Sequence, residues 1–272
     1  MVAATRPSES VEYPETDHMG DHETSINLAA ELKAQVVRML RDRRRVAHTG
    51  MNQLVYFDEG DPTRYRSPDL YVIENVPQEG PERASWKTWE GDVPSFALEV
   101  VSSNWRKDYD EVPADYDTMG VRELILFDPW ATPRSRRRVR WQVFRRVRGR
   151  GLARPLSSSD DRVESRVLGC FLRLVWEGVN ARLRVAIGTR GDTLVPTEAE
   201  MLAAAEVRAR IHEAQAEAER VARKTAEQYA LDAREARQEA EKRAEEERAA
   251  KQAVEAEVER LRAEIERLRN GR

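Results

Sequence analysis

The sequence predicts an α/β domain with a mixed, curved sheet, followed by a long C-terminal α-helix. An amphipathic helical pattern over residues 24–44 precedes several short apolar runs rich in β-branched and aromatic residues. A helical segment over residues 107–120 lies between two of these runs, which is typical of α/β proteins. From Thr197 onward proline is absent and Ala, Glu, Arg, Lys and Gln dominate, which favours one uninterrupted helix.

The elements before the long helix follow in order. Thr24 or Ser25 is the expected N-cap of the first helix, whose apolar face consists of Leu28, Leu32, Val36, Met39 and Leu40. Pro113 interrupts the helical segment between the strands, and Gly120 ends it. Strands are predicted over residues 53–57, 69–75, 95–101, 122–129, 137–147, 166–178 and 182–188.

The chain divides into three segments of different composition. Residues 1–21 are rich in Pro, Ser, Glu and Thr and lack an apolar run, which indicates a disordered lead-in rather than a secretory signal. Residues 22–196 carry the mixed elements of the predicted domain. Residues 197–272 form the long charged helix, which is a candidate coiled coil.

The long helix begins with a capping box and ends with an apolar seam. Glu200 lies three residues after Thr197, so we expect a helix over residues 198–269, about 100 Å long. Spacings of four and three residues, typical of coiled coils, separate Val254, Val258, Leu261, Ile265 and Leu268. We therefore expect a homodimer through residues 197–269. The alternative is a solitary charged helix supported by ion pairs between residues four apart.

Composition excludes several classes of protein. The 272 residues include 46 basic and 49 acidic side chains, and this balance does not indicate a nucleic-acid binder. The single cysteine, Cys170, excludes an intrachain disulfide, so we expect a cytoplasmic protein. Because Cys170 lies in an apolar strand, we interpret it as part of the core rather than as a reactive thiol. No run of about 18 apolar residues is present, so we expect no membrane contact.

Two acidic residues lie where the predicted strands are otherwise apolar. Asp69 opens a strand directly after Pro68, and Glu99 lies in the middle of the run FALEVV. If these strands are neighbours, the two carboxylates face each other and repel unless a cation or a proton lies between them. A hard divalent ion such as Mg²⁺ would relieve the repulsion. The alternative is an ion pair between Glu99 and a buried arginine such as Arg122 or Arg173.

Three stretches resemble a known family in their order and spacing. They are SPDLYVI at residues 67–73, FALEVVSSNWRKD at residues 96–108 and YDTMGVRELILFDP at residues 116–129. Over about residues 22–130 the chain resembles the Uma-type restriction endonuclease family, a branch of the PD-(D/E)XK nuclease superfamily. The resemblance implies a restriction-endonuclease-like core and an endonuclease that uses Mg²⁺ or Mn²⁺ to hydrolyse phosphodiester bonds.

The family pattern implies roles for individual residues. Asp69 and Glu99 correspond to the metal-binding acids, and the main-chain carbonyl of Val100 corresponds to a third metal ligand. The supporting residues are His22 before the first helix, Asp108 at the end of a loop and Tyr116 on the following helix. As a lone histidine, His22 is equally well explained as a helix-entry residue.

The catalytic lysine of the family pattern is absent from both of its usual places. Val101 and Val112 occupy these places, and Pro113 follows the second. Lys107 is the nearest lysine and the candidate replacement in catalysis, because its long stem is flexible. Lys87 is a weaker candidate. The acidic half of the expected site is therefore complete, while its basic half departs from the pattern.

Arginines are concentrated between residues 134 and 150. On a β-hairpin, alternate arginines would share one face, which suits phosphate contacts with DNA or RNA. The candidates for nucleic-acid binding are Arg136, Arg138, Arg140, Arg145 and Arg146. The alternative is a solvated edge hairpin whose charges oppose aggregation.

Three functions are compatible with these patterns. The first is a metal-dependent endonuclease that acts on nucleic acid, with DNA as the expected partner, and that dimerises through its tail. The second is a catalytically degenerate nuclease fold that serves as a nucleic-acid-binding or scaffolding protein through its long helix. The third is a structural coiled-coil protein whose residues 1–196 bind no nucleic acid.

Overall fold

The computed structural model describes residues 23–81, 83–132, 134–177 and 180–270. It contains two compact units, residues 1–201 and residues 202–272. The predicted lead-in over residues 1–21 and His22 lie outside the described residues. No helix of the described part combines the length and the apolar composition that crossing a lipid bilayer requires.

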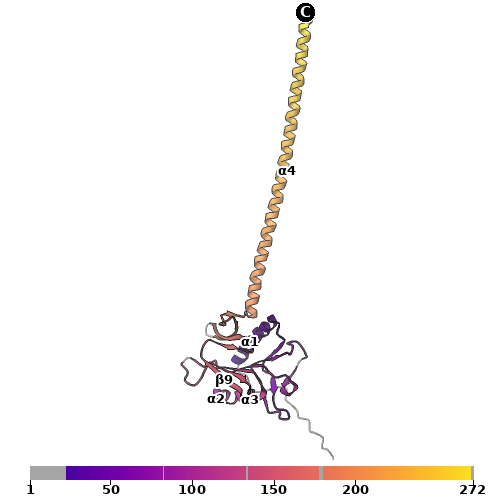
Figure 1. Ribbon diagram of the computed structural model, residues 1–272. Helices are drawn as coiled ribbons and strands as arrows, with labels where there is room; N and C mark the ends of the chain where they lie inside the picture. Colours follow the sequence, from indigo (N-terminus) through magenta and orange to yellow (C-terminus); the bar gives the residue numbers. More distant parts are fainter. Residues whose placement is uncertain (1–22, 82, 133, 178–179, 271–272) are drawn as a thin grey trace, which may run out of the picture. The chain divides into compact units, whose positions relative to one another are not determined.

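A six-stranded mixed sheet forms the centre of the first unit (Figure 1). In spatial order its strands are β1 (Ala47–Gly50), β4 (Leu70–Glu74), β6 (Phe96–Val100), β7 (Glu123–Phe127), β8 (Trp141–Val147) and β9 (Gly151–Ser158). The neighbours β6 and β7 are parallel, and the other neighbours are antiparallel. Parallel neighbours need a crossover connection, which α2 (Trp105–Asp110) and α3 (Val112–Met119) supply. The predicted α/β class with a mixed sheet is therefore confirmed.

Apolar clusters cover both faces of this sheet. Because side chains alternate along a strand, Leu98 belongs to one cluster and its neighbour Ala97 to the other. The first cluster includes the apolar side of α1 (Glu23–Asp42). All five predicted positions of that side are buried: Leu28, Leu32, Val36, Met39 and Leu40. The second cluster contains side chains of α3 and of a small sheet.

Two smaller sheets complete the first unit. The sequence predicted a single mixed sheet for all of the strands. A four-stranded antiparallel sheet consists of β10 (Arg162–Ser165), β11 (Cys170–Glu177), β12 (Asn180–Ile187) and β13 (Thr193–Leu194). A three-stranded sheet consists, in spatial order, of β3 (Tyr65–Arg66), β2 (Leu54–Tyr56) and β5 (Ser85–Lys87), which leads into a 3-10 turn at Thr88–Glu90. The predicted strands 53–57, 166–178 and 182–188 thus lie outside the central sheet. The apolar pattern of a strand indicates that the strand is buried, but it does not indicate which sheet the strand joins.

Proline and glycine shape the crossover as the sequence predicts. The helical segment breaks after Asp110, and Pro113 lies in the first turn of α3, where its missing N–H has no helical acceptor to lose. Gly120 ends α3 with φ of 92°, a left-handed conformation that glycine adopts without strain. The break tilts no side chain away from the sheet face, because Val112 and Tyr116 of α3 are both buried there.

The predicted capping box starts α4 (Glu198–Asn270). The N–H of Thr197 donates to Oε2 of Glu200 at 2.7 Å, and the N–H of Glu200 donates to Oγ1 of Thr197 at 3.2 Å. The same carboxylate pairs with the guanidinium of Arg184, which lies on β12 and is buried. Arg184 also donates to Gln35 of α1, so this ion pair attaches the first turn of α4 to both elements.

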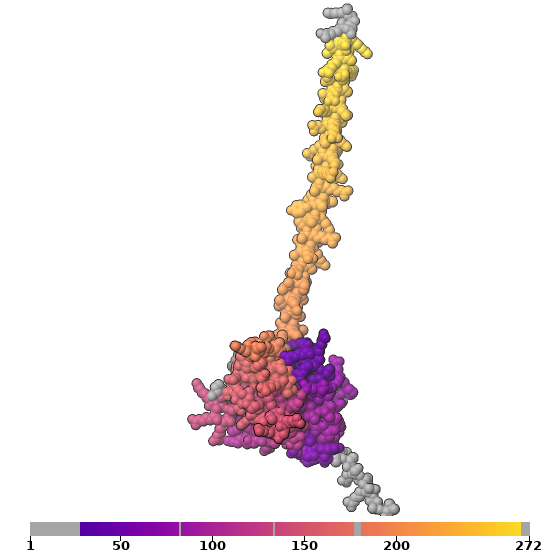
Figure 2. All heavy atoms as spheres, viewed as in Figure 1, coloured from indigo at the N-terminus to yellow at the C-terminus, as the bar shows by residue number. Residues whose placement is uncertain are grey.

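The rest of α4 is exposed along its described length, and Figure 2 shows side chains projecting from the face of the helix that is in view. The apolar residues of the predicted seam that the structure describes are Val254, Val258, Leu261 and Ile265. Each of them exposes at least 42% of its surface. A single chain thus leaves this row of apolar side chains in water, which is unfavourable unless another surface covers it.

Glu200→Ala removes half of the capping box and the acidic partner of Arg184. We expect the free energy of unfolding of the first unit to fall by about 1–2 kcal/mol at pH 7, measured by urea denaturation with tryptophan fluorescence. Accepting the Thr197 N–H and pairing with Arg184 hold the pKa of Glu200 below its ordinary value. The stabilisation that Glu200 provides is therefore present above its unfolded-state pKa, and it is lost as the pH falls through its folded-state pKa.

The matched control is Glu206→Ala, which removes a carboxylate further along α4 that has no ion pair among the described residues. The control should match the wild type at every pH. An equal loss of stability in both variants would show that the helix start makes no specific contribution.

Candidate active site

The register of β4 and β6 places Asp69 and Glu99 opposite each other. In this antiparallel pair Leu70 lies opposite Leu98, and one further step along both strands brings Asp69 opposite Glu99. Side chains directly opposite each other on antiparallel strands share a face of the sheet. By alternation both acids share the face that carries Ala97, which is the face that α3 covers.

Hydrogen bonds orient both carboxylates. The N–H of Val100 donates to Oδ2 of Asp69 at 2.6 Å, and the hydroxyl of Tyr116 on α3 donates to Oε1 of Glu99. In an extended strand the N–H and C=O of one residue lie on the same edge, so the carbonyl of Val100 also faces Asp69. The structure thus brings together four of the residues expected at the site, namely Asp69, Glu99, Val100 and Tyr116.

Burial and the like charge of Asp69 both raise the pKa of Glu99. Removal from water raises the pKa of Glu99 well above its ordinary value, and the neighbouring charge of Asp69 raises it further. The hydrogen bond from Tyr116 and the charge of Arg66 lower this pKa, but their effect is smaller. Without a cation, Glu99 therefore tends to hold a proton that the two acids share.

A positive charge that lowers the pKa of Glu99 belongs to Arg66 of β3, three residues before Asp69. Its Nε donates to Oδ2 of Asp115 on α3 at 2.8 Å, and its Nη2 contacts the same oxygen. Arg66 is thus held in place by Asp115 and influences Glu99 through space. The sequence pattern directs attention to lysines after Glu99, and it contains no signal for an arginine before Asp69.

The two candidate lysines lie on α2 and on β5. Lys107 is exposed on α2, and within the described residues its side chain has no hydrogen bond or ion pair. Lys87 lies at the end of β5, with its Nζ 3.8 Å from Oε1 of Glu90. Lys107 is therefore not among the charges that act on Glu99, whereas Arg66 is.

The arginines considered as alternative partners of Glu99 are engaged with other acids. Arg122 forms an ion pair with Glu74, and Nε of Arg173 lies 2.9 Å from Oδ2 of Asp161. Neither arginine is therefore the partner of Glu99.

The remaining supporting residue, Asp108, closes the loop between β6 and α2. Its Oδ2 accepts hydrogen bonds from the N–H and from the hydroxyl of Ser102, both at 2.7 Å. This loop immediately follows the strand that carries Glu99 and Val100, so Asp108 fixes the chain where it leaves the site.

The donors at this site suit a hard divalent cation. Mg²⁺ takes one or two carboxylates and completes its shell with water and phosphate oxygens, which fits Asp69, Glu99 and the Val100 carbonyl. Across the described ranges, no three His, Cys, Asp or Glu side chains are close enough together to hold a metal ion. A zinc site with three or four protein ligands is therefore not formed by these residues.

Two arginines of the arginine-rich segment form ion pairs with buried acids. Nε of Arg138 lies 2.7 Å from Oδ2 of Asp128, and Nε of Arg145 lies 2.7 Å from Oε1 of Glu123. Both acids are fully buried at opposite ends of β7. These arginines neutralise buried carboxylates. A guanidinium engaged in this way is less available for the phosphate contacts expected of it.

The other arginine candidates are divided between the fold and solvent. Arg140 donates to the main-chain carbonyls of Ser159 and Ala131, and Arg146 donates to those of Val121 and Asp117. Arg136 is exposed. The hairpin of β8 and β9 is therefore present, but its arginines are not gathered on one open face.

Glu99→Gln should stabilise the metal-free protein at neutral pH. A carboxyl whose pKa is raised in the folded state lowers stability as the pH rises from the unfolded-state pKa towards the folded-state pKa. The amide carries no charge, so in EDTA its free energy of unfolding should exceed that of the wild type by roughly 1 kcal/mol or more at pH 8.

Urea denaturation at several pH values measures this difference, which should vanish at acidic pH. Glu90→Gln, at an exposed carboxylate, is the control and should show no such pH dependence. A Glu99→Gln variant that is less stable than the wild type at pH 8 would show that the two acids do not repel.

Comparisons with known proteins place the chain in a family. A crystal structure of a putative nuclease of DUF820 from Anabaena variabilis matches with 15% identity and a TM-score of 0.38, over 58% of this chain and 78% of that chain. No protein with a curated description matches the chain. The family model of Uma2, described as "Putative restriction endonuclease", matches residues 14–174. This match spans more than half of the sequence and includes the acid pair, so the chain belongs to the Uma2 family.

Proposed function

We propose that this protein is a divalent-metal-dependent endonuclease that acts on nucleic acid, with DNA as its substrate. The observation that carries the proposal is the pair of facing carboxylates, Asp69 and Glu99, of which Glu99 has a raised pKa. Membership of the Uma2 family supports the same activity. In this proposal residues 22–196 are the nuclease-like domain and residues 197–272 are the coiled-coil segment.

Each residue of the site has a defined task in this reaction. A bound Mg²⁺ or Mn²⁺ ion would supply Lewis-acid stabilisation of the negative charge that develops on the phosphodiester. Asp69, Glu99 and the Val100 carbonyl would hold the ion, while the Val100 N–H and the Tyr116 hydroxyl keep both carboxylates aligned. Glu99 would have to lose its proton to hold the ion, so metal binding should weaken as the pH falls.

Arg66 is the proposed basic residue of the site in place of a lysine. A guanidinium donates hydrogen bonds and accepts none, so Arg66 can stabilise negative charge but cannot act as a general base. Asp115 holds this guanidinium in position. Lys107, which is exposed on α2, remains the alternative that the sequence favours.

A second candidate function is a non-catalytic, nucleic-acid-binding or scaffolding protein. The observation that favours it is that Val101 and Val112 occupy the two places where the family pattern has its lysine. In that case Mn²⁺ uptake could persist without cleavage.

Cleavage of plasmid DNA in Mg²⁺ or Mn²⁺ tests the proposed activity. Asp69→Asn and Glu99→Gln should each lower the rate by at least about 100-fold, because each removes a charged ligand of the cation. Calorimetric titration with Mn²⁺ should show uptake by the wild type and none by either variant. Glu90→Gln should retain both properties. No cleavage by the wild type, combined with uptake that depends on Asp69, would favour the non-catalytic function.

Substitution of the basic residues separates the two cation candidates. Arg66→Gln should slow cleavage by about tenfold or more while Mn²⁺ uptake is retained, and Arg66→Lys should recover part of the rate. Lys107→Gln should change neither measurement by more than about twofold. The reverse order of effects would assign the role to Lys107.

We also propose that the protein forms a homodimer in the cytoplasm through its C-terminal segment. The exposed row from Val254 to Ile265 supports self-association. The single cysteine, Cys170, supports the location, because its burial raises the pKa of its thiol to about 12 and no disulfide is needed.

Replacing Val258 and Leu261 by aspartate should abolish the dimer. Two charges on the seam would be buried against each other in the coiled coil. Sedimentation equilibrium should give a mass near twice 31.3 kDa for the wild type and near 31.3 kDa for the double variant. A control with aspartates at the exposed positions Arg260 and Arg267 should remain dimeric. A monomeric wild type would favour the solitary charged helix.

A further inference from the structure

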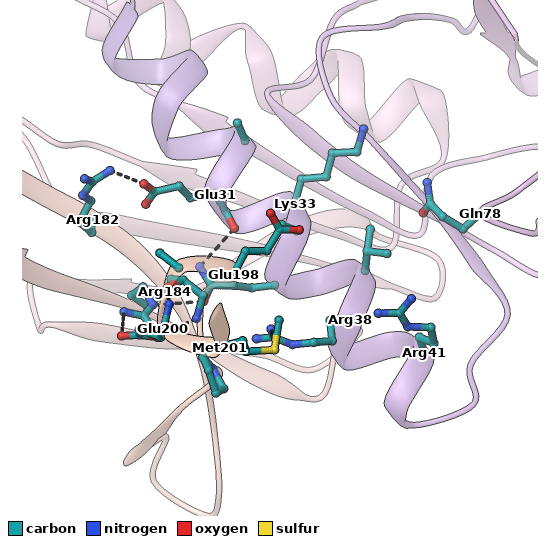
Figure 3. Close-up of a pocket in the computed structure, with 17 residues that line it drawn as sticks. Glu31, Lys33, Arg38, Arg41, Gln78, Arg182, Arg184, Glu198, Glu200 and Met201 are labelled. Carbon is teal, nitrogen blue, oxygen red and sulfur yellow. Dashed lines mark hydrogen bonds and ion pairs between the residues drawn. The ribbon is translucent and has the colours of Figure 1, made fainter. Parts of the chain in front are cut away.

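A pocket of about 920 Å³ lies between α1 and the first turn of α4 (Figure 3). Its lining comes from the outer side of α1, from Arg182 and Arg184 of β12, from Gln78, and from residues 196–201. All of these residues belong to the first compact unit. In Figure 2 the surface of α1, in indigo, adjoins the orange surface of the residues that lead into α4.

This pocket is separate from the acid pair. α1 packs on the face of the central sheet that carries Leu98, whereas Asp69 and Glu99 share the opposite face with Ala97. The sheet therefore lies between the two sites, and a ligand in the pocket would not touch the proposed metal ligands.

Positively charged side chains outnumber negatively charged ones in the lining of the pocket. Arg182 pairs with Glu31, and Arg184 pairs with Glu200. The other lining cations are Lys33, Arg38 and Arg41, and none of them has an acidic partner within the described ranges. Glu198 is the opposing lining carboxylate outside these pairs. The residual charge of the lining is therefore positive, which favours an anion.

Arg38 provides the most specific signal. It extends across the pocket towards Met201 (Figure 3), and its Nη1 contacts the Met201 sulfur, which is a weak acceptor. Its Nη2 is buried and has no hydrogen-bond partner in the described structure. A buried guanidinium nitrogen without an acceptor is destabilising, so this group is prepared for an oxygen that a ligand would supply.

The first turn of α4 adds donors on the same side. The N–H groups of Glu200 and Met201 are bonded to the side chain and the carbonyl of Thr197. The N–H groups of Glu198 and Ala199 precede them at the start of the helix, where no helical acceptor exists. A helix start of this kind carries partial positive charge and suits a phosphate group.

We propose that this pocket binds a small phosphate-bearing molecule of mononucleotide size. Its phosphate contacts Arg38, Arg41 and the first turn of α4. Its less polar part packs on the apolar lining of Ala34, Val37 and Met201. The volume lies within the range of small-molecule sites in proteins, and arginines with a helix start are a common means of holding phosphate. The proposal does not depend on the nuclease activity.

Isothermal titration of the full chain in EDTA with AMP, inorganic phosphate and adenosine tests the proposal. AMP should bind, phosphate should bind more weakly, and adenosine should not bind. Arg38→Met should weaken AMP binding by about tenfold or more, and added NaCl should weaken it in the wild type. Arg190→Met, at an exposed arginine outside the pocket, should bind AMP as the wild type does. Ala34→Trp, which fills the pocket from the exposed side of α1, should abolish binding.

Several results would overturn the proposal. They are no binding of AMP or phosphate, equal binding of AMP and adenosine, and unchanged AMP binding in Ala34→Trp. Loss of AMP binding in Asp69→Asn would place the ligand at the acid pair instead. If Arg38→Met fails to give the circular dichroism spectrum of the wild type, Ala34→Trp alone decides.

Discussion

The pairing register of β4 with β6 is the constraint on which the site depends. It sets Asp69 opposite Glu99 on a face that α3 and the three-stranded sheet cover. A shift of one residue in either strand would turn its acid to the other face, against the cluster that contains α1. The register is fixed by burial on both faces, since Leu70, Leu98 and Ala97 all lie inside apolar clusters. The repulsion between the two acids is thus maintained by the free energy of the surrounding core.

Other acids of the central sheet show how unusual Glu99 is. Glu123 and Asp128 are fully buried at the two ends of β7, and each has an arginine at hydrogen-bonding distance. Glu99 has a phenol and a second carboxylate as its neighbours instead. The fold therefore pairs Glu123 and Asp128 with arginines, whereas it places Glu99 beside a second carboxylate that raises its pKa. The same comparison explains two arginines of the arginine-rich segment, Arg138 and Arg145, because each compensates for a buried acid.

Local patterns in the sequence predicted the parts of the structure that depend on neighbouring residues. The apolar side of α1, the capping box of Thr197 with Glu200, the break at Pro113 and the acid pair are of this kind. Strands of two to four residues, such as β3 and β5, are too short to show a period, and β9 contains Gly151 and Pro155 and has no buried position. The role of Arg66 was also missed, because it depends on the packing of a small sheet against α3. The same limit applies to the arginines of β8. Alternation along the strand predicts the face of the sheet on which each side chain lies, but not the acid with which it forms an ion pair.

The position of Arg66 next to Ser67, Pro68 and Asp69 has an evolutionary consequence. The first acid and the cation near it are encoded by almost adjacent codons, while Glu99 and Asp115 are encoded downstream. A recombination event that transfers the segment around Asp69 therefore transfers Arg66 as well, but it does not transfer Asp115, which holds the Arg66 guanidinium. The guanidinium keeps its position only where the transferred segment meets an α3 that carries this carboxylate.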